Sequence, residues 1–551
     1  MTALLFARLA AVPLSLMLAA AAPSPIADRV KAEQAAADRI RGHVQFLASD
    51  ELEGRDTGSR GYAVAAAYVA AQFASLGLKP GGTGGGWYLE VPFRRASHAS
   101  PPQARLSHGK RTIAFVSGID FALQASLLER SRAIDAPLVF AGRGLSEPKL
   151  GVDDYAGLDV RGKFVVVLSG PPPGLPSEIA AHLDSTLDST ATRAEAAARR
   201  GAIGLVEISA SPGGTPHRFG SWARPRVDWI DTAGKTGTAS LLRATLALTS
   251  KSAERLFDGA PKSLAAVRAQ AKSQRTVRGF ALPARLSITA HSVWEDFSSP
   301  EVIGLLPGGD PRLAQEYVVL MGHLDHLGVK PDAKPGEDAI YNGALDNAAG
   351  IATMLEAARD FVESGKRPRR SVLFIANTGE ERGLLGADYF AAHPTVPIRQ
   401  IVGAVDLDMP LLMYDFTDVV AFGADHSTVA RAVDRAAIGM GMSVSADPMP
   451  EESIFVRSDH YQFVRRGVPA ILLFTGYANG GKAQWDRFFA NVYHKPNDDI
   501  AQPINWRAGA RYARLNYEIS RILADADQRP RWYRGDYFGD TFAPGQPRAE
   551  R

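Results

Sequence analysis

The chain has 551 residues, which at roughly 150 residues per domain is enough for two to four domains with large buried cores. Lysine and arginine total 62 against 59 aspartate and glutamate, and this near-neutral formal charge of +3 argues against a nucleic acid partner. The chain contains no cysteine, so disulfides, thiolate metal sites and cysteine nucleophiles are excluded. Any bound metal must therefore be held by His, Asp and Glu side chains.

The start of the chain predicts a targeting segment. Arg8 precedes an apolar run over residues 9–22, which ends in alanines before Pro23. The run is shorter than the roughly 20 residues that a transmembrane helix needs. Residues 1–22 are therefore interpreted as the signal peptide of an exported protein, periplasmic or secreted, and not as a membrane anchor. No later stretch of sequence is long and apolar enough to span a membrane, so we expect no stable membrane insertion once the signal is removed.

The next two regions differ in their periodicity. Residues 23–130 contain two Ala-rich stretches with helical spacing, 27–47 and 62–76, joined through a polar connection at 50–59. Residues 131–270 instead carry short apolar runs of β type between Gly and Pro residues. We expect the first region to belong to the main domain and the second to form an inserted, compact β-rich module.

From Glu316 onward, strand-like apolar runs alternate with helical stretches, which is typical of a mostly parallel α/β sheet. The main domain is assigned to residues 271–525, and residues 526–551 form a C-terminal tail with no helical or strand period. The sequence predicts strands at 317–321, 371–376, 401–407 and 469–474, and helices at 348–363, 384–392 and 427–437.

Acidic and imidazole side chains follow three of these strands. His323 and Asp325 come after the first strand, Glu380 and Glu381 after the second, and Asp408 after the third. Ligands of open α/β sheets bind beyond the carboxyl ends of the strands, so we expect these side chains to converge on one crevice. Each of them alone would be weak evidence, because acids often cap helices or lie in solvent.

The number of possible ligands favours two metal ions over one. Five protein ligands are too many for one open catalytic zinc, but they suit two ions that share a bridging carboxylate. Zinc is the expected metal, with cobalt or manganese as alternatives. The five expected ligands are His323, Asp346, Glu381, Asp408 and His494.

Two acids are left for other roles. Glu380, beside a ligand, suits a general base that takes a proton from water. Asp325 is placed to accept the second ring N–H of His323 and so fix the tautomer of that ligand.

Several runs together resemble a known family, the co-catalytic dizinc aminopeptidases of clan MH, whose relatives include glutamate carboxypeptidase II. The resemblance covers roughly residues 295–525, and residues 52–58 are similar to the family's N-terminal segment. The runs that carry it are Gly322-His323-Leu324-Asp325-His326, Gly343-Ala344-Leu345-Asp346-Asn347-Ala348-Ala349-Gly350, Thr378-Gly379-Glu380-Glu381, Asp406-Leu407-Asp408-Met409 and Tyr493-His494-Lys495-Pro496-Asn497-Asp498-Asp499.

This resemblance implies a three-layer α/β/α sandwich with a mixed, mostly parallel sheet. It also implies that Asp346 bridges the two zinc ions, that His323 and Asp408 complete one site, and that Glu381 and His494 complete the other. Glu380 would be the base, and Tyr493 would donate a hydrogen bond to the scissile carbonyl oxygen. Two positions, Leu345 and Pro410, depart from the family pattern without removing a ligand.

The inserted module has a resemblance of its own. The runs at 139–144, 153–155 and 159–163 are similar to the protease-associated domain that is often inserted in these peptidases, which carries no chemistry itself. Near the cleft, His326 is expected to form part of a wall or to support a ligand. His460 is expected either to line the pocket or to be structural, and Arg457 either to contact substrate or to form a surface ion pair.

The sequence therefore predicts an exported metallopeptidase that acts on peptides through a water bridging two zinc ions. Aminopeptidase activity is preferred, because most relatives with this layout trim amino-terminal residues. A carboxypeptidase or dipeptidase of the same fold is the first alternative. A non-catalytic, receptor-like binding protein is the second, and the sequence leaves the oligomeric state open.

Overall fold

A computed structural model of the chain describes residues 25–184, 189–216, 219–222, 224–237 and 242–551. The predicted signal peptide at 1–22 lies outside the described residues. Among the helices of the described part, none combines the length and apolar character that crossing a bilayer requires.

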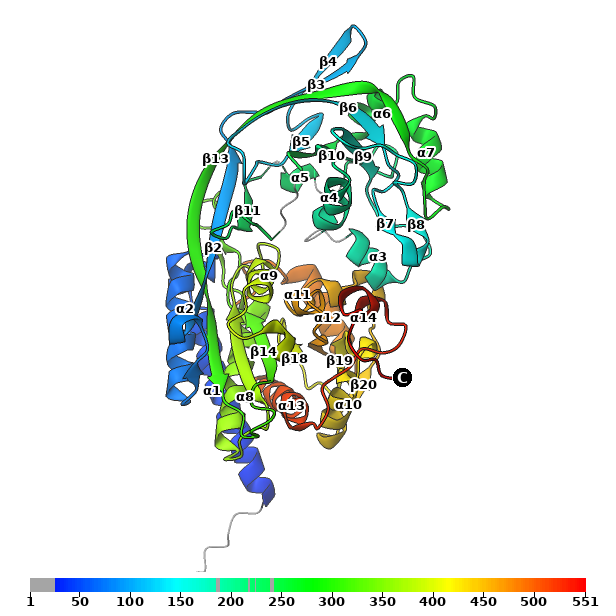
Figure 1. Cartoon of the computed structure of the whole chain (residues 1–551). Coiled ribbons are helices and arrows are strands. Elements are labelled where there is room, and N and C mark those ends of the chain that lie inside the picture. The colour runs from blue at the N-terminus through cyan, green and yellow to red at the C-terminus, as the bar shows by residue number, and fades with distance from the viewer. Residues whose placement is uncertain (1–24, 185–188, 217–218, 223, 238–241) are drawn as a thin grey trace, which may run out of the picture.

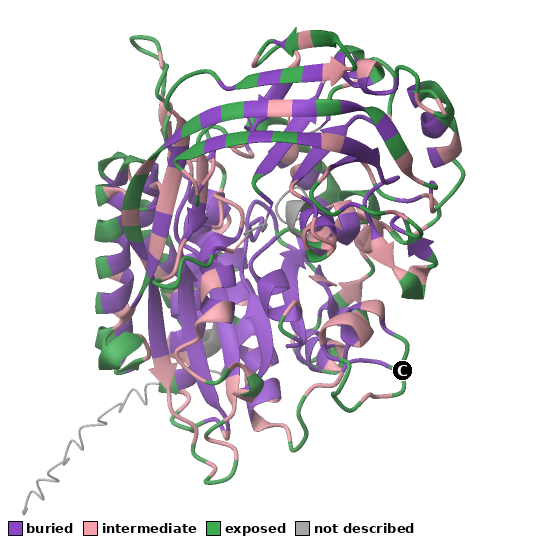
Figure 2. Cartoon of the chain, turned by 45° about the horizontal axis from the view of Figure 1, so that its top comes forward, coloured by how far each residue is buried: buried purple, intermediate pink, exposed green. Residues whose placement is uncertain are grey.

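The main domain is built on a mixed sheet whose centre is parallel (Figure 1). Four neighbouring strands run parallel in the order β17, β14, β18, β21, while β13 and β19 lie antiparallel at either side. The parallel strands are β14 (Tyr317–His323), β17 (Ser371–Asn377), β18 (Ile401–Asp406) and β21 (Ala470–Thr475). Nearly all of their residues are buried, as expected for strands covered on both faces (Figure 2).

Helices cover the two faces of this sheet. On one side, α1 (Pro25–Leu47), α8 (Ala349–Glu363) and α13 (Trp506–Asp525) pack against one another, and the last two contact β14. Elsewhere, α9 (Leu385–Ala392) packs on α11 (His460–Val464), which contacts β21. This arrangement confirms the predicted three-layer α/β/α fold with a mostly parallel sheet.

The remaining elements of the main domain are short strands and helices that flank the central sheet. They are η1 (Asp50–Arg55), α2 (Arg60–Ser75), β1 (Lys79–Pro80), β2 (Tyr88–His98), β11 (Arg226–Trp229), β15 (Gly328–Val329), β16 (Ile340–Tyr341), β19 (Asp418–Phe422), α10 (Val429–Gly439), β20 (Ser443–Ser445) and α12 (Gly481–Asn491).

One long strand, β13 (Phe280–Leu306), joins this domain to a second, β-rich lobe (Figure 1). Its C-terminal part pairs with β17 and β2, and its N-terminal part pairs with β3 and β6 of the lobe. The lobe contains β3 (Gln103–His108), β4 (Arg111–Phe115), β5 (Phe121–Leu123), β6 (Ser131–Phe140), β7 (Ser146–Glu147), β8 (Val152–Asp153), β9 (Phe164–Leu168), α3 (Ser177–Asp184), α4 (Ser189–Arg199), β10 (Gly204–Ile208), α5 (Phe219–Trp222), β12 (Ala244–Leu248), α6 (Ser250–Leu256) and α7 (Leu264–Ala271). Apart from β11, which pairs with β2 of the main domain, the predicted module at 131–270 lies within this lobe, and its identity as a protease-associated domain stays a prediction.

The C-terminal segment at 526–551, whose sequence shows no helical or strand period, contains regular structure. A short helix, α14 (Tyr537–Phe542), is capped by Asp536, whose side chain accepts from the backbone N–H of Gly539. Trp532 is buried and donates its indole N–H to Gly467 O at 3.0 Å. A six-residue helix held by tertiary contacts is too short to produce a periodic pattern in the sequence.

Candidate metal centre

The predicted ligands meet at the carboxyl ends of the parallel strands. His323 is the last residue of β14, Asp408 follows β18 by two residues, and Glu381 lies in the loop after β17. Asp346 lies just before α8, in a non-helical backbone conformation next to a cis peptide bond. His494 comes from the loop after α12, with a left-handed φ of +55°. The strand-end argument from the sequence therefore places all five side chains in one region.

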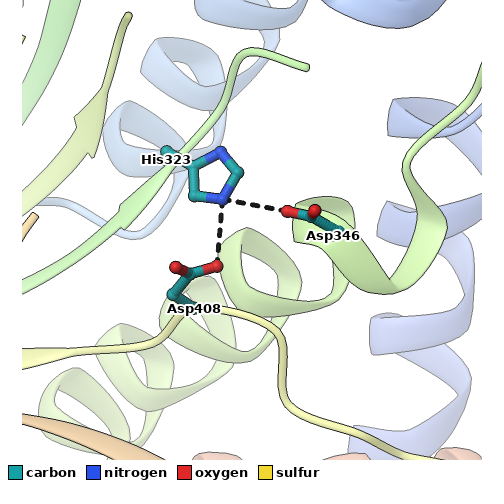
Figure 3. A group of neighbouring side chains, drawn as sticks. All are labelled: His323, Asp346 and Asp408. Atoms are coloured by element: carbon teal, nitrogen blue, oxygen red, sulfur yellow. Dashed lines mark hydrogen bonds and ion pairs between the residues drawn. The ribbon is translucent and has the colours of Figure 1, made fainter. Parts of the chain in front are cut away.

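Three of these side chains form the first half of the centre (Figure 3). His323 Nε2 lies 3.0 Å from Asp408 Oδ1 and 3.1 Å from Asp346 Oδ1. All three residues are buried. Ser458 Oγ contacts the carboxylate of Asp408, 2.8 Å from its Oδ2, and also lies 2.9 Å from Asp406 Oδ2.

The second half uses the other oxygen of the same aspartate. His494 Nε2 lies 3.2 Å from Asp346 Oδ2 and 3.4 Å from Glu381 Oε2. Asp346 thus turns one carboxylate oxygen toward each histidine, which is the geometry of a bridging ligand. Its backbone is fixed by Asp498, whose carboxylate accepts from the N–H groups of Leu345 and Asp346, both at 3.0 Å.

His326 contributes to this half in a way that the sequence prediction understated. It is fully buried, and its Nδ1 lies 2.7 Å from Glu381 Oε1. With zinc–ligand bonds of about 2.0–2.2 Å, two ligands of a tetrahedral ion are separated by about 3.3–3.5 Å. The contacts of His494 are close to that separation, and the shorter His326 contact is no hydrogen bond, because neither ring nitrogen of His326 has a hydrogen-bond partner in the described part of the chain. His326, Asp346 and Glu381 form a group of described residues that could hold a metal ion, so His326 is a candidate ligand of this half beside the predicted His494. Its place three residues after His323 was the available signal.

The structure corrects the expected role of the Asp325 side chain. His323 Nδ1 donates to the backbone carbonyl of Asp325 at 3.0 Å and not to its carboxylate. The carboxylate instead accepts from Thr57 Oγ1 at 2.9 Å and from the backbone N–H of Glu380 at 3.2 Å. The tautomer of His323 is fixed as predicted, by a different atom, while the carboxylate of Asp325 holds the loop of the expected base.

Charges in the centre are strongly coupled. Burial raises the pKa of Glu380 well above its ordinary value, and the carboxylates of Glu381 and Asp408 act in the same direction. Burial alone would lower the pKa of His323, but Asp408 and Glu380 raise it well above 6.5. Burial would also raise the pKa of Asp346, yet its contacts with His323 and His494 hold that pKa well below 3.8. Such an excess of buried carboxylates over imidazoles suits divalent cations, so the donor set fits zinc.

A pocket opens onto this centre. Tyr493 and Glu380 line it beside the ligands, and Arg457 lies at its wall. The Arg457 guanidinium also pairs with Glu452 at 2.9 Å, as expected for a surface ion pair, while its contact with substrate stays a prediction. His460 is fully buried and is not among the pocket-lining residues. The apolar lining consists of Met409, Ile454, Leu472, Phe474 and Phe489.

A mostly parallel sheet with helices on both faces carries a His–carboxylate centre at its strand ends, which fits the class of metal-dependent α/β proteins. Residues 301–520 match the sequence profile of Peptidase family M28. This match covers less than half of the chain, and it confirms the predicted resemblance to the clan MH zinc peptidases. The comparisons do not extend this assignment to a protease-associated domain.

The named relatives match short parts of the chain. A probable zinc metalloprotease of Pyrenophora teres f. teres is 34% identical over 108 residues, which are 20% of this chain and 22% of that protein. A vacuolar membrane protease of Yarrowia lipolytica is 44% identical over 165 residues, 29% of this chain and 15% of that protein. The chain thus spans less than a quarter of the length of these relatives.

Solved structures align over a larger share of the chain. The aminopeptidase from Aneurinibacillus sp. strain AM-1 is 20% identical, with 90% of this chain and 95% of that chain covered and a TM-score of 0.48. A zinc aminopeptidase from Bacillus subtilis is 17% identical, with coverages of 88% and 94% and a TM-score of 0.40.

The predicted periplasmic or secreted location was wrong. Several matched relatives, from Yarrowia lipolytica, Candida glabrata, Phaeosphaeria nodorum and Sclerotinia sclerotiorum, are named vacuolar membrane protease. These names point to a vacuolar membrane for those proteins. An apolar run near the start of a chain specifies membrane targeting but does not specify the final compartment.

Proposed function

We propose that the protein is a dizinc metallopeptidase that acts as an aminopeptidase on peptide substrates. The observation that carries this proposal is the position of Asp346, whose two carboxylate oxygens lie 3.1 Å from His323 Nε2 and 3.2 Å from His494 Nε2. One ion would be held by His323, Asp346 and Asp408, and the other by Asp346, Glu381 and His494. Cobalt or manganese would fit the same donors.

When bound, the ions would supply Lewis-acid polarisation of the peptide carbonyl and lower the pKa of the attacking water. The chain itself supplies the proton transfers. Glu380 takes a proton from that water at its carboxylate and then gives it to the nitrogen of the leaving amine. Its raised pKa, caused by burial and by neighbouring carboxylates, strengthens it as a base.

Tyr493 supplies a second interaction with the substrate. Burial and the Asp346 carboxylate raise the pKa of its phenol, so the hydroxyl stays protonated at any working pH. It can then donate a hydrogen bond to the carbonyl oxygen as negative charge develops there. Its ring is fixed by stacking on His494, with a centroid separation of 3.8 Å.

The pocket offers little positive charge from its own side chains to hold a free carboxylate of the substrate. Among the described residues that line the pocket, Arg457 is the one Lys or Arg, and it already pairs with Glu452. The acids that line it are Asp346, Glu380 and Asp408. A carboxypeptidase needs cations that hold the carboxyl end of its substrate, so aminopeptidase action is the better supported of the two.

The test is the Glu380→Gln variant, assayed on aminoacyl anilides and on amino-blocked and carboxyl-blocked peptides. We expect two equivalents of zinc to be retained and kcat to fall by roughly 10²–10⁴-fold, the contribution typical of a positioned acid–base group. Glu518→Gln on α13, whose carboxylate pairs with Arg514 of the same helix at 2.7 Å, is the matched control and keeps full activity. Undiminished hydrolysis by Glu380→Gln, or wild-type protein that binds no zinc, would contradict the proposal. Preferential cleavage of amino-blocked peptides would favour a carboxypeptidase.

A further inference from the structure

The segment Arg55–Thr57 touches three of the loops that carry the metal ligands and the base, those of His323, Asp346 and Glu380–Glu381, although it lies more than 260 residues before them. Arg55 is 1% exposed, and among the ion pairs of the described residues it has no carboxylate partner. Its guanidinium is satisfied instead by four backbone carbonyls. Nε donates to Leu324 O at 2.9 Å, and the terminal nitrogens donate to Leu47 O, to Asn342 O at 2.7 Å and to Gly343 O at 3.0 Å.

These acceptors lie on the loop of His323 and on the loop of Asp346, two ligands that are proposed to share one zinc ion. Leu324 directly follows His323, while Gly343 begins the turn that presents Asp346. The planar fork of arginine directs its N–H groups at several acceptors at once, so one side chain sets the distance between the two loops. The backbone of Arg55 adds a further contact, because its carbonyl accepts from the His326 N–H at 3.2 Å.

The next two residues reach the third loop. Thr57 Oγ1 donates to Asp325 Oδ2 at 2.9 Å, and Asp325 Oδ1 accepts from the backbone N–H of Glu380 at 3.2 Å. Asp56 forms an ion pair with Arg382, which follows the ligand Glu381.

The approach of this segment depends on Gly54. Its φ is +66°, and a Cβ at this position would lie 2.5 Å from Gly328 O and 2.6 Å from Tyr341 O. A side chain would therefore push the segment away from both neighbouring loops. The close approach is what allows Arg55 to reach the carbonyls behind the centre.

We propose that Arg55 is a positioning residue of the metal centre, which fixes the separation of His323 and Asp346 and thereby the affinity for zinc, and that Thr57 positions Glu380 through Asp325. This inference rests on the proposed dizinc function. Groups that orient metal ligands typically contribute about 10–100-fold to metal affinity. Thr57 contacts the loop of the base and no ligand, so its loss acts on kcat and leaves zinc affinity and KM in place.

The experiment measures zinc affinity by competition with a chromophoric chelator, independently of activity. We expect Arg55→Met to bind zinc about 10–100-fold more weakly than wild type, and Arg55→Lys to recover part of this loss because it keeps the charge but not the fork. The absorption spectrum of the cobalt-substituted protein shifts in Arg55→Met, since the ligand geometry changes. Thr57→Val keeps zinc affinity and KM, while kcat falls by roughly tenfold.

The matched control is Arg39→Met, which breaks the ion pair between Arg39 on α1 and Glu356 on α8. It lowers thermal stability but leaves zinc affinity unchanged. The proposal is overturned if Arg55→Met binds two zinc ions as tightly as wild type, or if Arg39→Met loses as much zinc affinity as Arg55→Met. If Arg55→Met does not fold, Arg55→Lys and Thr57→Val provide the test. The proposal is then overturned if Arg55→Lys has wild-type zinc affinity and Thr57→Val has wild-type kcat. Wild-type protein without zinc would instead contradict the proposed function itself.

Discussion

Two sets of parallel, buried strands occur in this molecule, and they end in very different residues. In the main domain, β14 ends at His323, and the loop after β17 carries Glu380 and Glu381. In the lobe, β9 and β10 are buried at every residue as well, but they are followed by Ser169 and Ser209. Among the described residues, the groups that could hold a metal ion lie in the main domain alone.

The difference shows that the strand geometry does not by itself make a site. Parallel strands covered on both faces produce a similar edge in both sheets, and the chemistry depends on which side chains stand at that edge. The acids and histidines at the edge of the main-domain sheet cost stability when buried without counter-charges, whereas the residues that directly follow β9 and β10 are uncharged serines. The comparison therefore predicts that substitutions in the main domain change chemistry and that equivalent substitutions in the lobe change stability.

The largest effect is expected for Asp346→Ala. Removal of the bridging carboxylate leaves each half of the centre with two of its three protein ligands, so neither holds zinc firmly. Because metal ions contribute several kcal/mol to transition-state stabilisation, we expect kcat/KM to fall by on the order of 10³-fold or more. Zinc content after dialysis and hydrolysis of aminoacyl anilides check this together. A variant that keeps both ions would refute the bridging role.

Tyr493→Phe comes next and leaves the ligands intact. Loss of the hydroxyl removes one donor to the developing oxyanion, which typically costs about 10²–10³-fold in kcat. KM and zinc content should stay near wild type, because the phenol is not a ligand. A change in KM with constant kcat would indicate that Tyr493 binds the ground state of the substrate instead.

The contact between the lobe and the main domain contains a histidine, so its contribution to stability should depend on pH. His426 Nδ1 lies 2.6 Å from Asp536 Oδ2, and Nε2 lies 3.1 Å from Glu178 Oε2 on α3 of the lobe. Burial alone would lower the pKa of His426, but these two carboxylates raise it to about 9. A histidine with a folded-state pKa above its unfolded value of 6.5 contributes its full stabilisation below pH 6.5 and loses it as the pH rises through 9.

We therefore expect the free energy of unfolding to decrease by up to about 3 kcal/mol between pH 6.5 and pH 9.5 through this group. Thermal unfolding at a series of pH values in wild type and His426→Gln measures the effect as a difference. The variant should lack this part of the pH dependence. Parallel pH profiles of Tm in the two proteins would mean that the ion pairs do not hold the lobe to the main domain.

The sequence predicted the parts of the fold and site that depend on local pattern. The parallel strands were placed within about two residues, because each is a continuous apolar run with turns at its ends. The ligands followed from their positions after those strands. The sequence did not predict that the Asp325 backbone would take the role assigned to its side chain, since both lie at the same position in the chain.

Contacts between distant residues were also beyond prediction. Arg55 reaches Leu324 and Gly343, which are 269 and 288 positions away, and no local pattern connects them. The motif around Arg55 resembles the N-terminal segment of the family, but its physical role depends on the folded path of three loops. The path of β13 through both sheets could not be predicted either, because the alternating pattern of a strand does not mark the point where it passes from one sheet to the other.

Val166→Ala in the lobe is the variant with the smallest expected effect on activity. Val166 is fully buried in the middle of β9 and belongs to the apolar cluster of the lobe. Loss of two methyl groups should lower stability by about 2 kcal/mol through lost burial and the cavity left behind. Zinc affinity, kcat and KM should all equal those of wild type, because no described contact of β9 reaches the centre. A tenfold loss of kcat with both zinc ions retained would mean that the lobe takes part in the chemistry. Substitutions in both sheets would then change catalysis, to different extents.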